Sequence, residues 1–419
     1  MDYIKHDMGN YNLYLIKTKK FKTISVSINL RRENTKEAEV YCTLLKRLLP
    51  LATAKYPDID KLYRASMDIY NPSVNFNSIV SGKDRWFSLE SSFASEKYTE
   101  KEMNKKSLEF ILDYLWEPYI VNDSFDEKLF DICKHEIIED LKSIKNDPDR
   151  YSSERAWEEM EILPFDEMGI KETIEFTEAV TANELYNYYQ SMFKEDALDI
   201  FIAGNFNDNK MIKIVKDLVT GDFKPSYKNR LINLEKPEEV KQITEKTNNK
   251  QSKLVMGLKH VDLTEYERKY VWVAYNSILG GSWNSKLNKV VREEHSLCYY
   301  VYSSRKMPFG VSFIHSGINS KDVDKAVKLI QEEIKKIAKG KISDEELQVV
   351  KDTYDNALTN IEDNQFAILD NIVSCVFSDT DSIEDRRRIM NGVTKEEVAI
   401  VGQKVCLDII YLLEGRQAK

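Results

Sequence analysis

The sequence has few of the residues that most metal and disulfide sites require. It contains five cysteines and five histidines among 419 residues. The cysteines are odd in number and widely spaced, and no C-x-x-C occurs. This pattern is typical of free thiols in a reducing compartment rather than of a disulfide framework or a zinc ribbon. We therefore expect a cytoplasmic protein.

Glycine, proline and long apolar runs are also scarce. With 14 glycines and 9 prolines, collagen-like and low-complexity structures are excluded. No apolar run is long enough for a membrane span, and the opening segment lacks the apolar core of a secretory signal, so we expect neither. Lysine and arginine total 61 against 70 acidic residues, a net charge of −9, which argues against binding to nucleic acid or to an anionic membrane surface.

What the sequence does contain is a weak internal repeat. An alternating strand pattern at residues 25–30 precedes a helical stretch at 35–51. A second strand pattern at 253–258 likewise precedes a helical stretch at 266–279. The same order of elements in both halves predicts a duplicated chain.

Two further pairs keep this order. The capping boxes Thr181–Glu184 and Thr394–Glu397 each predict a helix start. Each predicted helix leads into a short apolar strand, at 198–203 and at 407–412. We expect two homologous domains, each a sheet with helices packed mainly on one face.

The expected boundaries follow the composition. Residues 221–250 are polar and charged and are the predicted linker, with one strand of the second sheet inside them. The N-terminal domain then covers 1–220 and the C-terminal domain covers 251–419.

Catalytic metal motifs are incomplete throughout. Neither H-E-x-x-H nor H-x-x-E-H occurs. His135 and Glu139 lie one helical turn apart, but a catalytic zinc needs three protein ligands, so we interpret this pair as a solvated helix face. The segment before His295 has valine at position 291, where the first histidine of an H-x-x-E-H motif would stand, and valine cannot bind a metal.

Nucleophile and phosphate-binding motifs are missing as well. The sequence has no G-x-S-x-G, P-loop or dinucleotide fingerprint. Cys298 lies close to His295, which leaves open an independent hydrolase that uses this thiol, although the sequence indicates no third, orienting group.

One segment, residues 279–304, carries a specific resemblance. It reads LGGSWNSKLNKVVREEHSLCYYVYSS and predicts a helix, a turn and a strand. It resembles the pattern L-G-G-G-x-S-S-R-L-F-x-x-V-R-E-x-x-G-L-A-Y-x-V-Y-S, which is common in the second domains of pitrilysin/insulinase-type zinc peptidases. This family includes the mitochondrial processing peptidases and short bacterial two-domain members. The main departures are Trp283, His295, Ser296 and Cys298.

The resemblance implies a fold and two functional residues. The fold is α+β and like that of mitochondrial processing peptidases, with a mixed, mostly antiparallel sheet in each domain. Family members use an arginine and a tyrosine seven residues apart, on the second domain, to contact the substrate opposite the zinc. The matching residues here are Arg292 and Tyr299. Both side chains can donate hydrogen bonds to a developing oxyanion without competing for its proton.

The zinc motif that the resemblance implies is degenerate. Thr43 and Arg47 take the places of the two histidines of H-x-x-E-H, and Lys46 takes that of the glutamate base, although the register could slip by one or two. The third ligand falls near Glu139 or Asp140. A lysine and an arginine would repel a dication and could not activate its water. We therefore expect no cofactor in this chain.

By resemblance, the chain is a zinc-less subunit. Some bacterial members work as heterodimers in which one subunit keeps H-x-x-E-H and the other keeps the arginine and tyrosine. We expect the chain to be inactive alone and to join a homologous zinc-bearing subunit in hydrolysing peptides. The alternative is a non-catalytic scaffold or peptide-binding protein of the same family.

Overall fold

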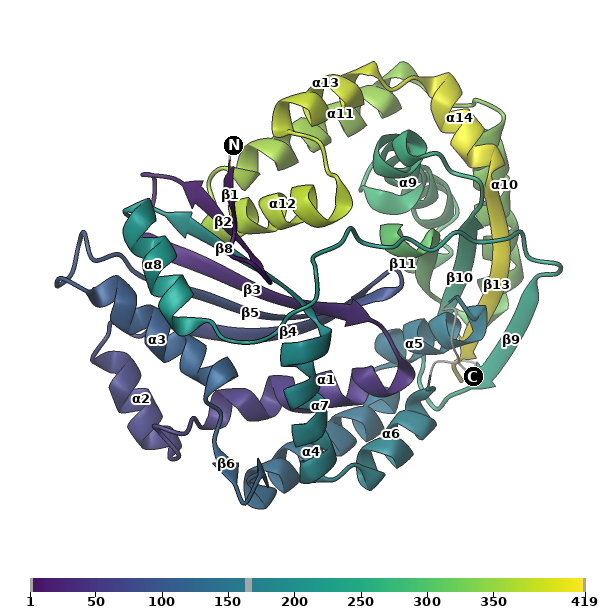
Figure 1. The fold of residues 1–419 in the computed structure, drawn as a ribbon. Coiled ribbons are helices and arrows are strands. Elements are labelled where there is room, and N and C mark those ends of the chain that lie inside the picture. The colour runs from purple at the N-terminus through teal and green to yellow at the C-terminus, as the bar shows by residue number, and fades with distance from the viewer. Residues whose placement is uncertain (1–2, 163–167, 417–419) are drawn as a thin grey trace. The chain divides into compact units, whose positions relative to one another are not determined.

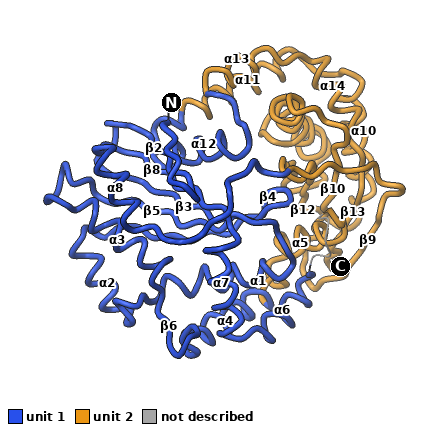
Figure 2. Tube along the Cα trace, in the orientation of Figure 1, with its two compact units in different colours: residues 1–142, 168–230, 360–382 blue, residues 143–167, 231–359, 383–419 orange. Residues whose placement is uncertain are grey.

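A computed structural model describes residues 3–162 and 168–416. The chain divides into two compact units, drawn in blue and orange in Figure 2. Unit 1 comprises residues 1–142, 168–230 and 360–382, and unit 2 comprises residues 143–167, 231–359 and 383–419.

Unit 1 is built on a six-stranded sheet with the strand order β1-β2-β8-β3-β5-β4. Neighbouring strands are antiparallel except β2 and β8, which are parallel. The two central strands are almost wholly buried, because both faces of the sheet are covered. The strands are β1 (Tyr3–Asp7), β2 (Asn12–Lys17), β3 (Thr23–Glu33), β4 (Ser73–Ser81), β5 (Asp84–Ala94) and β8 (Ala197–Gly204).

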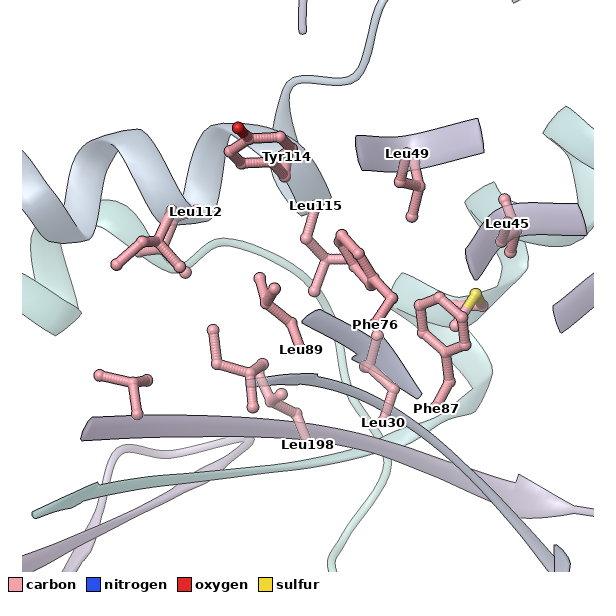
Figure 3. Close-up of a cluster of buried hydrophobic side chains, with 14 of the residues drawn as sticks. Leu30, Leu45, Leu49, Phe76, Phe87, Leu89, Leu112, Tyr114, Leu115 and Leu198 are labelled. Atoms are coloured by element: carbon pink, nitrogen blue, oxygen red, sulfur yellow. The ribbon is translucent and has the colours of Figure 1, made fainter. Parts of the chain in front are cut away.

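The main core of unit 1 lies between this sheet and a layer of helices on one face. Figure 3 shows Leu30, Leu89 and Leu198 of the sheet beneath Leu112 and Leu115 of a covering helix. The helices of unit 1 on this side are α1 (Lys36–Leu48), α2 (Ile59–Met67), α3 (Met103–Trp116), α4 (Glu127–Ser143), α6 (Ile170–Ala179), α7 (Ala182–Glu195) and α8 (Asp208–Leu218), with a short hairpin of β6 (Ile120–Val121) and β7 (Ser124–Phe125).

The second face of the unit 1 sheet carries one helix, α12 (Gln365–Ser378). Figure 1 shows α12, in yellow-green, on the opposite side of the sheet from α1 and α3. Its apolar residues, including Ile372 and Phe377, pack against Tyr14 and Phe201 of the sheet. A helix from the C-terminal half of the chain therefore completes the sheet of the N-terminal half.

Unit 2 repeats this sheet with five strands in the order β11-β12-β10-β13-β9. Again a single pair, β13 and β9, is parallel, and the other pairs are antiparallel. The two orders match strand by strand once β1 is set aside, which confirms the predicted duplication and the mixed, mostly antiparallel sheets. The strands are β9 (Lys241–Lys246), β10 (Ser252–His260), β11 (Cys298–Lys306), β12 (Val311–Ile318) and β13 (Val405–Glu414).

The helices of unit 2 pack mainly on one face of this sheet. The predicted helix at 266–279 contains two π-helical stretches. The predicted capping box at Thr394 is present in this unit, and the one at Thr181 is present in unit 1. The segments are η3 (Glu267–Val271), α9 (Trp272–Asn276), η4 (Ser277–Gly281), η5 (Asn288–Glu294), α10 (Val323–Ala338), α11 (Asp344–Ile361), α13 (Ile383–Gly392) and α14 (Lys395–Gln403).

The second face of the unit 2 sheet carries α5 (Pro148–Met160), which Figure 1 shows beside β10 and β13. The approach is close, because a Cβ atom added at Gly257 of β10 would lie 2.4 Å from Met160 Sδ. The exchange of helices is thus reciprocal, with α5 and α12 each covering the sheet of the other half.

Because of this exchange, the compact units do not follow the expected domain boundaries. The expected domains were continuous, covering 1–220 and 251–419, whereas the compact units interleave along the chain. Residues 143–167 join unit 2 and residues 360–382 join unit 1. The physical reason is burial: each sheet has a second apolar face, and the helix that buries it comes from the opposite half. The predicted linker at 221–250 is also divided, because unit 1 extends to residue 230.

One buried histidine, His260, and one half-buried histidine, His315, are expected to make the stability of unit 2 depend on pH. His260 is 1% exposed and its Nε2 lies 2.7 Å from Ser312 Oγ. Burial lowers the pKa of His260 to about 3 and that of His315 to about 4. Both imidazoles are therefore neutral in the folded chain, whereas they take up protons near pH 6.5 when unfolded. The two neutral histidines make their full contribution to the free energy of unfolding above about pH 6.5. Below that pH the free energy of unfolding decreases, by up to about 1.4 kcal/mol per pH unit for each histidine.

We expect the urea concentration at the unfolding midpoint of unit 2 to decrease as the pH is lowered from about 7 to about 5. His260→Gln, which removes one titrating group, should have a shallower pH dependence even if it is less stable at pH 7. Urea titrations of both proteins at several pH values test this. An equally steep fall in the variant would contradict the assignment.

Candidate functional site

Arg292 lies on the π-helical segment η5, close to its C-terminal end. The segment closes with a bond from His295 N to Val290 O (3.2 Å), and Leu297 N then donates to Val291 O (3.0 Å). The wide π-helical turn and the bonds that end it therefore fix the path of the backbone beside Arg292. Irregular turns of this kind are frequent at functional sites.

The predicted turn at 295–296 joins this segment to β11. Ser296 adopts a left-handed conformation with φ +49°. The family pattern carries glycine at this position, and glycine is the residue that adopts such backbone without steric cost. Ser296 therefore adopts this turn at some cost in conformational energy.

Tyr299 lies in a β-bulge at the start of β11. Cys298 pairs with Ile318 and Tyr300 with Gly317, which leaves Tyr299 as the extra residue. Tyr300 is held by α5, because its hydroxyl donates to Asp149 Oδ1. Bulges re-aim side chains and are common beside active sites. The bulge leaves Tyr299 67% exposed.

The polar ends of Arg292 and Tyr299 form no hydrogen bond or ion pair in the part of the chain that the structure describes. No carboxylate pairs with Arg292, whose guanidinium carbon lies 5.2 Å from the ring centroid of Trp283. No hydrogen bond engages the Tyr299 hydroxyl. By contrast, Arg155 in the same unit forms ion pairs with three carboxylates. The pair is therefore available to an external ligand.

The thiol of Cys298 is poorly suited to catalysis. Burial raises its pKa, although a hydrogen bond with Ser316 and the charge of Arg292 act in the opposite direction. A raised pKa keeps the sulfur protonated, whereas a catalytic cysteine must form a thiolate. His295 is exposed and has no contact with Cys298 among the described interactions. The structure therefore gives no support to a cysteine hydrolase.

The degenerate metal position lies on α1 of unit 1. Thr43 is half-buried and Lys46 is exposed. Arg47 reaches across to α4, where Nη1 donates to Glu136 Oε2 (3.2 Å) and Nη2 donates to Asp140 Oδ2. An organic cation, the guanidinium, thus pairs with the carboxylates of the helix on which the third zinc ligand was expected.

These residues do not fit a zinc ion. A zinc site needs neutral imidazoles or thiolates in addition to a carboxylate, and Thr43 and Arg47 supply neither. Among residues 3–162 and 168–416, no group of three or more histidine, cysteine, aspartate or glutamate side chains could hold a metal. His135 is exposed and Glu139 instead pairs with Lys142 at 3.4 Å.

The chain is similar to known proteins in both sequence and fold. Residues 179–354 match the family described as the peptidase M16 inactive domain. The chain is 25% identical to a Bacillus subtilis (strain 168) protein named probable inactive metalloprotease YmfF, over 99% of this chain and 98% of that protein. The chain is thus similar to the M16 peptidases. The resemblance predicted from the 279–304 segment is thereby confirmed.

Two further comparisons extend this result. A second B. subtilis relative, named uncharacterized zinc protease YmxG, is 26% identical over 67% of this chain and 68% of its own length. A crystal structure of a conserved protein from Enterococcus faecalis V583 is 24% identical, covers 100% of both chains and superposes with a TM-score of 0.92. The likeness to the E. faecalis structure shows the fold alone. Within the described residues, none of the helices is long and apolar enough to span a membrane.

Two residues of this chain were not assigned a role from sequence. In the sequence, Trp283 stands out only as a departure from the family pattern. Its place between a glycine-rich helix end and the next helix could have marked it as a candidate functional residue. Glu136 was not predicted, because His135 and Glu139 form the pair that a metal could bridge. Its spacing of four residues from Asp140 places both carboxylates on one helix face, which could have been recognised.

Proposed function

We propose that this chain is the zinc-less subunit of a heterodimeric peptidase and that it supplies Arg292 and Tyr299 to the reaction. Zinc and the carboxylate that activates its water belong to a homologous partner. Arg292 and Tyr299 bind the carbonyl oxygen of the scissile peptide bond and stabilise the negative charge that develops on it. Both remain donors at neutral pH, so neither takes the proton of the intermediate.

The observation that carries the proposal is the contrast between the two positions. The guanidinium of the half-buried Arg292 and the hydroxyl of the exposed Tyr299 form no hydrogen bond or ion pair among the described residues of unit 2. The guanidinium of Arg47, in contrast, is committed to Glu136 and Asp140 where a metal would have to bind. The donors of an oxyanion site are thus accessible, while the metal position is closed.

The relatives support a partner of the same family. B. subtilis has both a homologue named as an inactive metalloprotease and one named as a zinc protease. A zinc protease of this second type, from the same cell as our chain, is the proposed partner. The five free cysteines fit a cytoplasmic setting for the complex.

The proposal predicts a large loss of activity from small changes at the pair. In a mixture of this chain with its zinc-bearing homologue, Arg292→Ala and Tyr299→Phe should each lower kcat for a fluorogenic peptide by roughly 10²–10³-fold, because each removes one oxyanion donor. Size-exclusion chromatography of each mixture shows whether the complex still assembles.

Matched variants serve as controls. Arg388→Ala alters an arginine that is 73% exposed, and Tyr63→Phe alters a tyrosine that is 61% exposed, so both should leave kcat unchanged. Full activity of assembled Arg292→Ala and Tyr299→Phe complexes would refute a catalytic role for the pair. A complex that forms but never cleaves peptides would favour the scaffold alternative.

A further inference from the structure

The most exposed large apolar side chains flank Arg292. Among the described residues, Trp283 at 76% and Tyr299 at 67% are the two large hydrophobic residues with the highest exposure. Tyr302, further along β11, is 46% exposed. Tryptophan is usually well buried in folded proteins, so an indole left this open calls for an explanation.

Trp283 is held by an ordered loop rather than displayed on a loose one. The preceding helix ends at Gly281, where a Cβ atom would lie 2.9 Å from Asn276 Nδ2. Beyond Trp283, the buried Ser285 donates from its backbone N to Ser282 O at 3.2 Å. The buried Asn288 donates from Nδ2 to Ser282 O at 3.1 Å and so ties the loop to the segment that carries Arg292.

The indole of Trp283 has two uses that are compatible. The Arg292 guanidinium lies near its ring, 5.2 Å from the centroid, as in a cation–π contact. With three quarters of the side chain still exposed, most of the indole remains accessible to a ligand. A peptide whose carbonyl oxygen is bound by Arg292 and Tyr299 would bring a neighbouring side chain close to this surface.

We infer that Trp283 is a specificity-determining residue that packs against an aromatic or large aliphatic side chain next to the scissile bond of the peptide. This inference rests on the proposed function, since it places the substrate at Arg292 and Tyr299. Glu293 and Glu294 are exposed beside the site, which disfavours an acidic side chain at the same place. The substrates are therefore peptides with an apolar, preferably aromatic, residue at this position.

The test compares two peptides that differ only in this residue, phenylalanine or alanine. With the reconstituted complex, Trp283→Ala should lower kcat/KM for the phenylalanine peptide by roughly ten-fold or more, because aromatic packing and apolar burial are lost. For the alanine peptide the fall should be only about two- to five-fold, from the lost cation–π contact. Trp283→Phe should restore most of the preference, and Tyr63→Ala, at another exposed aromatic residue, should leave it unchanged.

A second readout uses the isolated chain and needs no catalysis. The indole N–H resonance of Trp283 is identified by its loss in Trp283→Phe, and uncleavable versions of both peptides are titrated in. The phenylalanine peptide should shift this resonance clearly more than the alanine peptide does, because only its ring packs on the indole. An unmoved resonance overturns the inference, even if no active complex can be assembled.

The kinetic outcomes separate this inference from the proposed function. If Trp283→Ala lowers kcat/KM equally for both peptides, Trp283 only positions Arg292, and the inference fails. If the variant breaks the complex on size exclusion, Trp283 belongs to the subunit interface, and the inference fails as well. In either case, a large effect of Arg292→Ala leaves the proposed function standing. No effect of Arg292→Ala would instead refute the proposed function.

Discussion

Replacing Asp199 with alanine should lower the free energy of unfolding of unit 1 by about 3–5 kcal/mol. Natural domains have only about 5–15 kcal/mol in total, so the variant should unfold at a much lower urea concentration, or fail to fold at all. The reason is an ion pair in the interior of the unit 1 sheet. Arg31 of β3 and Asp199 of β8 are both 0% exposed, and Arg31 Nη2 donates to Asp199 Oδ2 at 2.8 Å.

The surroundings show why Arg31 depends on this partner. Nε and Nη1 of Arg31 have no hydrogen-bond partner among the described residues, and its guanidinium lies 3.5 Å from the ring centroid of Phe377 in α12. Ser226 Oγ accepts the one other hydrogen bond from this group, at 2.9 Å. Removal of Asp199 would therefore leave a buried positive charge with a hydroxyl and aromatic rings as its only compensation.

A double-variant cycle tests this account. Arg31→Met combined with Asp199→Ala removes both charges and should be more stable than Asp199→Ala alone. Asp363→Ala, which breaks the exposed pair with Lys20, should change the stability by less than about 1 kcal/mol. Urea unfolding should be followed by circular dichroism and by fluorescence together, because two units need not unfold in one step. A double variant no more stable than the single one would show that charge burial is not the cause.

Local signals in the sequence predicted the elements of this fold well. The capping boxes at Thr181 and Thr394 begin α7 and α14, because each satisfies backbone N–H groups within its own first turn. The alternating segment at 25–30 lies within β3, and the paired segment at 253–258 lies within β10. The duplication was readable because the same short patterns recur in the same order.

Long-range features were not readable in this way. Helices α5 and α12 separate apolar from polar residues only weakly, and nothing within them indicates that each covers the sheet of the opposite half. The buried Arg31 follows the apolar part of β3 and looks like a surface residue in the sequence. Its burial depends on Asp199, which lies 168 positions away along the chain. Partners this distant leave no local pattern.

The same difference between local and long-range features applies to the candidate site. The sequence predicted that a lysine and an arginine at positions 46 and 47 would exclude a metal, and the resemblance gave Arg292 and Tyr299. The carboxylates that Arg47 pairs with, and the cation–π contact between Trp283 and Arg292, became visible only with the structure. Both depend on side chains that meet across different segments of the fold.

Three substitutions should give this chain a zinc site. Thr43→His, Lys46→Glu and Arg47→His together restore H-x-x-E-H on α1. Histidines four residues apart share one helix face, and Arg47 already reaches the α4 carboxylates at that face. Two imidazoles and one carboxylate make up the three protein ligands of a catalytic type of zinc site. After dialysis against dilute zinc, we expect about one zinc ion per chain in the triple variant by elemental analysis, and essentially none in the parent chain.

The same experiment identifies the third ligand and checks the register. In the triple variant, Glu136→Gln and Asp140→Asn are introduced separately, and the one that removes the true ligand should abolish zinc retention. Arg47→His alone should hold no zinc, because two ligands are missing. A folded triple variant without zinc would show that Thr43 and Arg47 are not the histidine positions. Stoichiometric zinc in the parent chain would overturn the zinc-less assignment itself. Zinc in the triple variant but not in the parent chain would mean that these three residues of α1 account for the missing metal. In that case α4 still presents the carboxylate that the metal needs, and in the parent chain Arg47 pairs with that carboxylate.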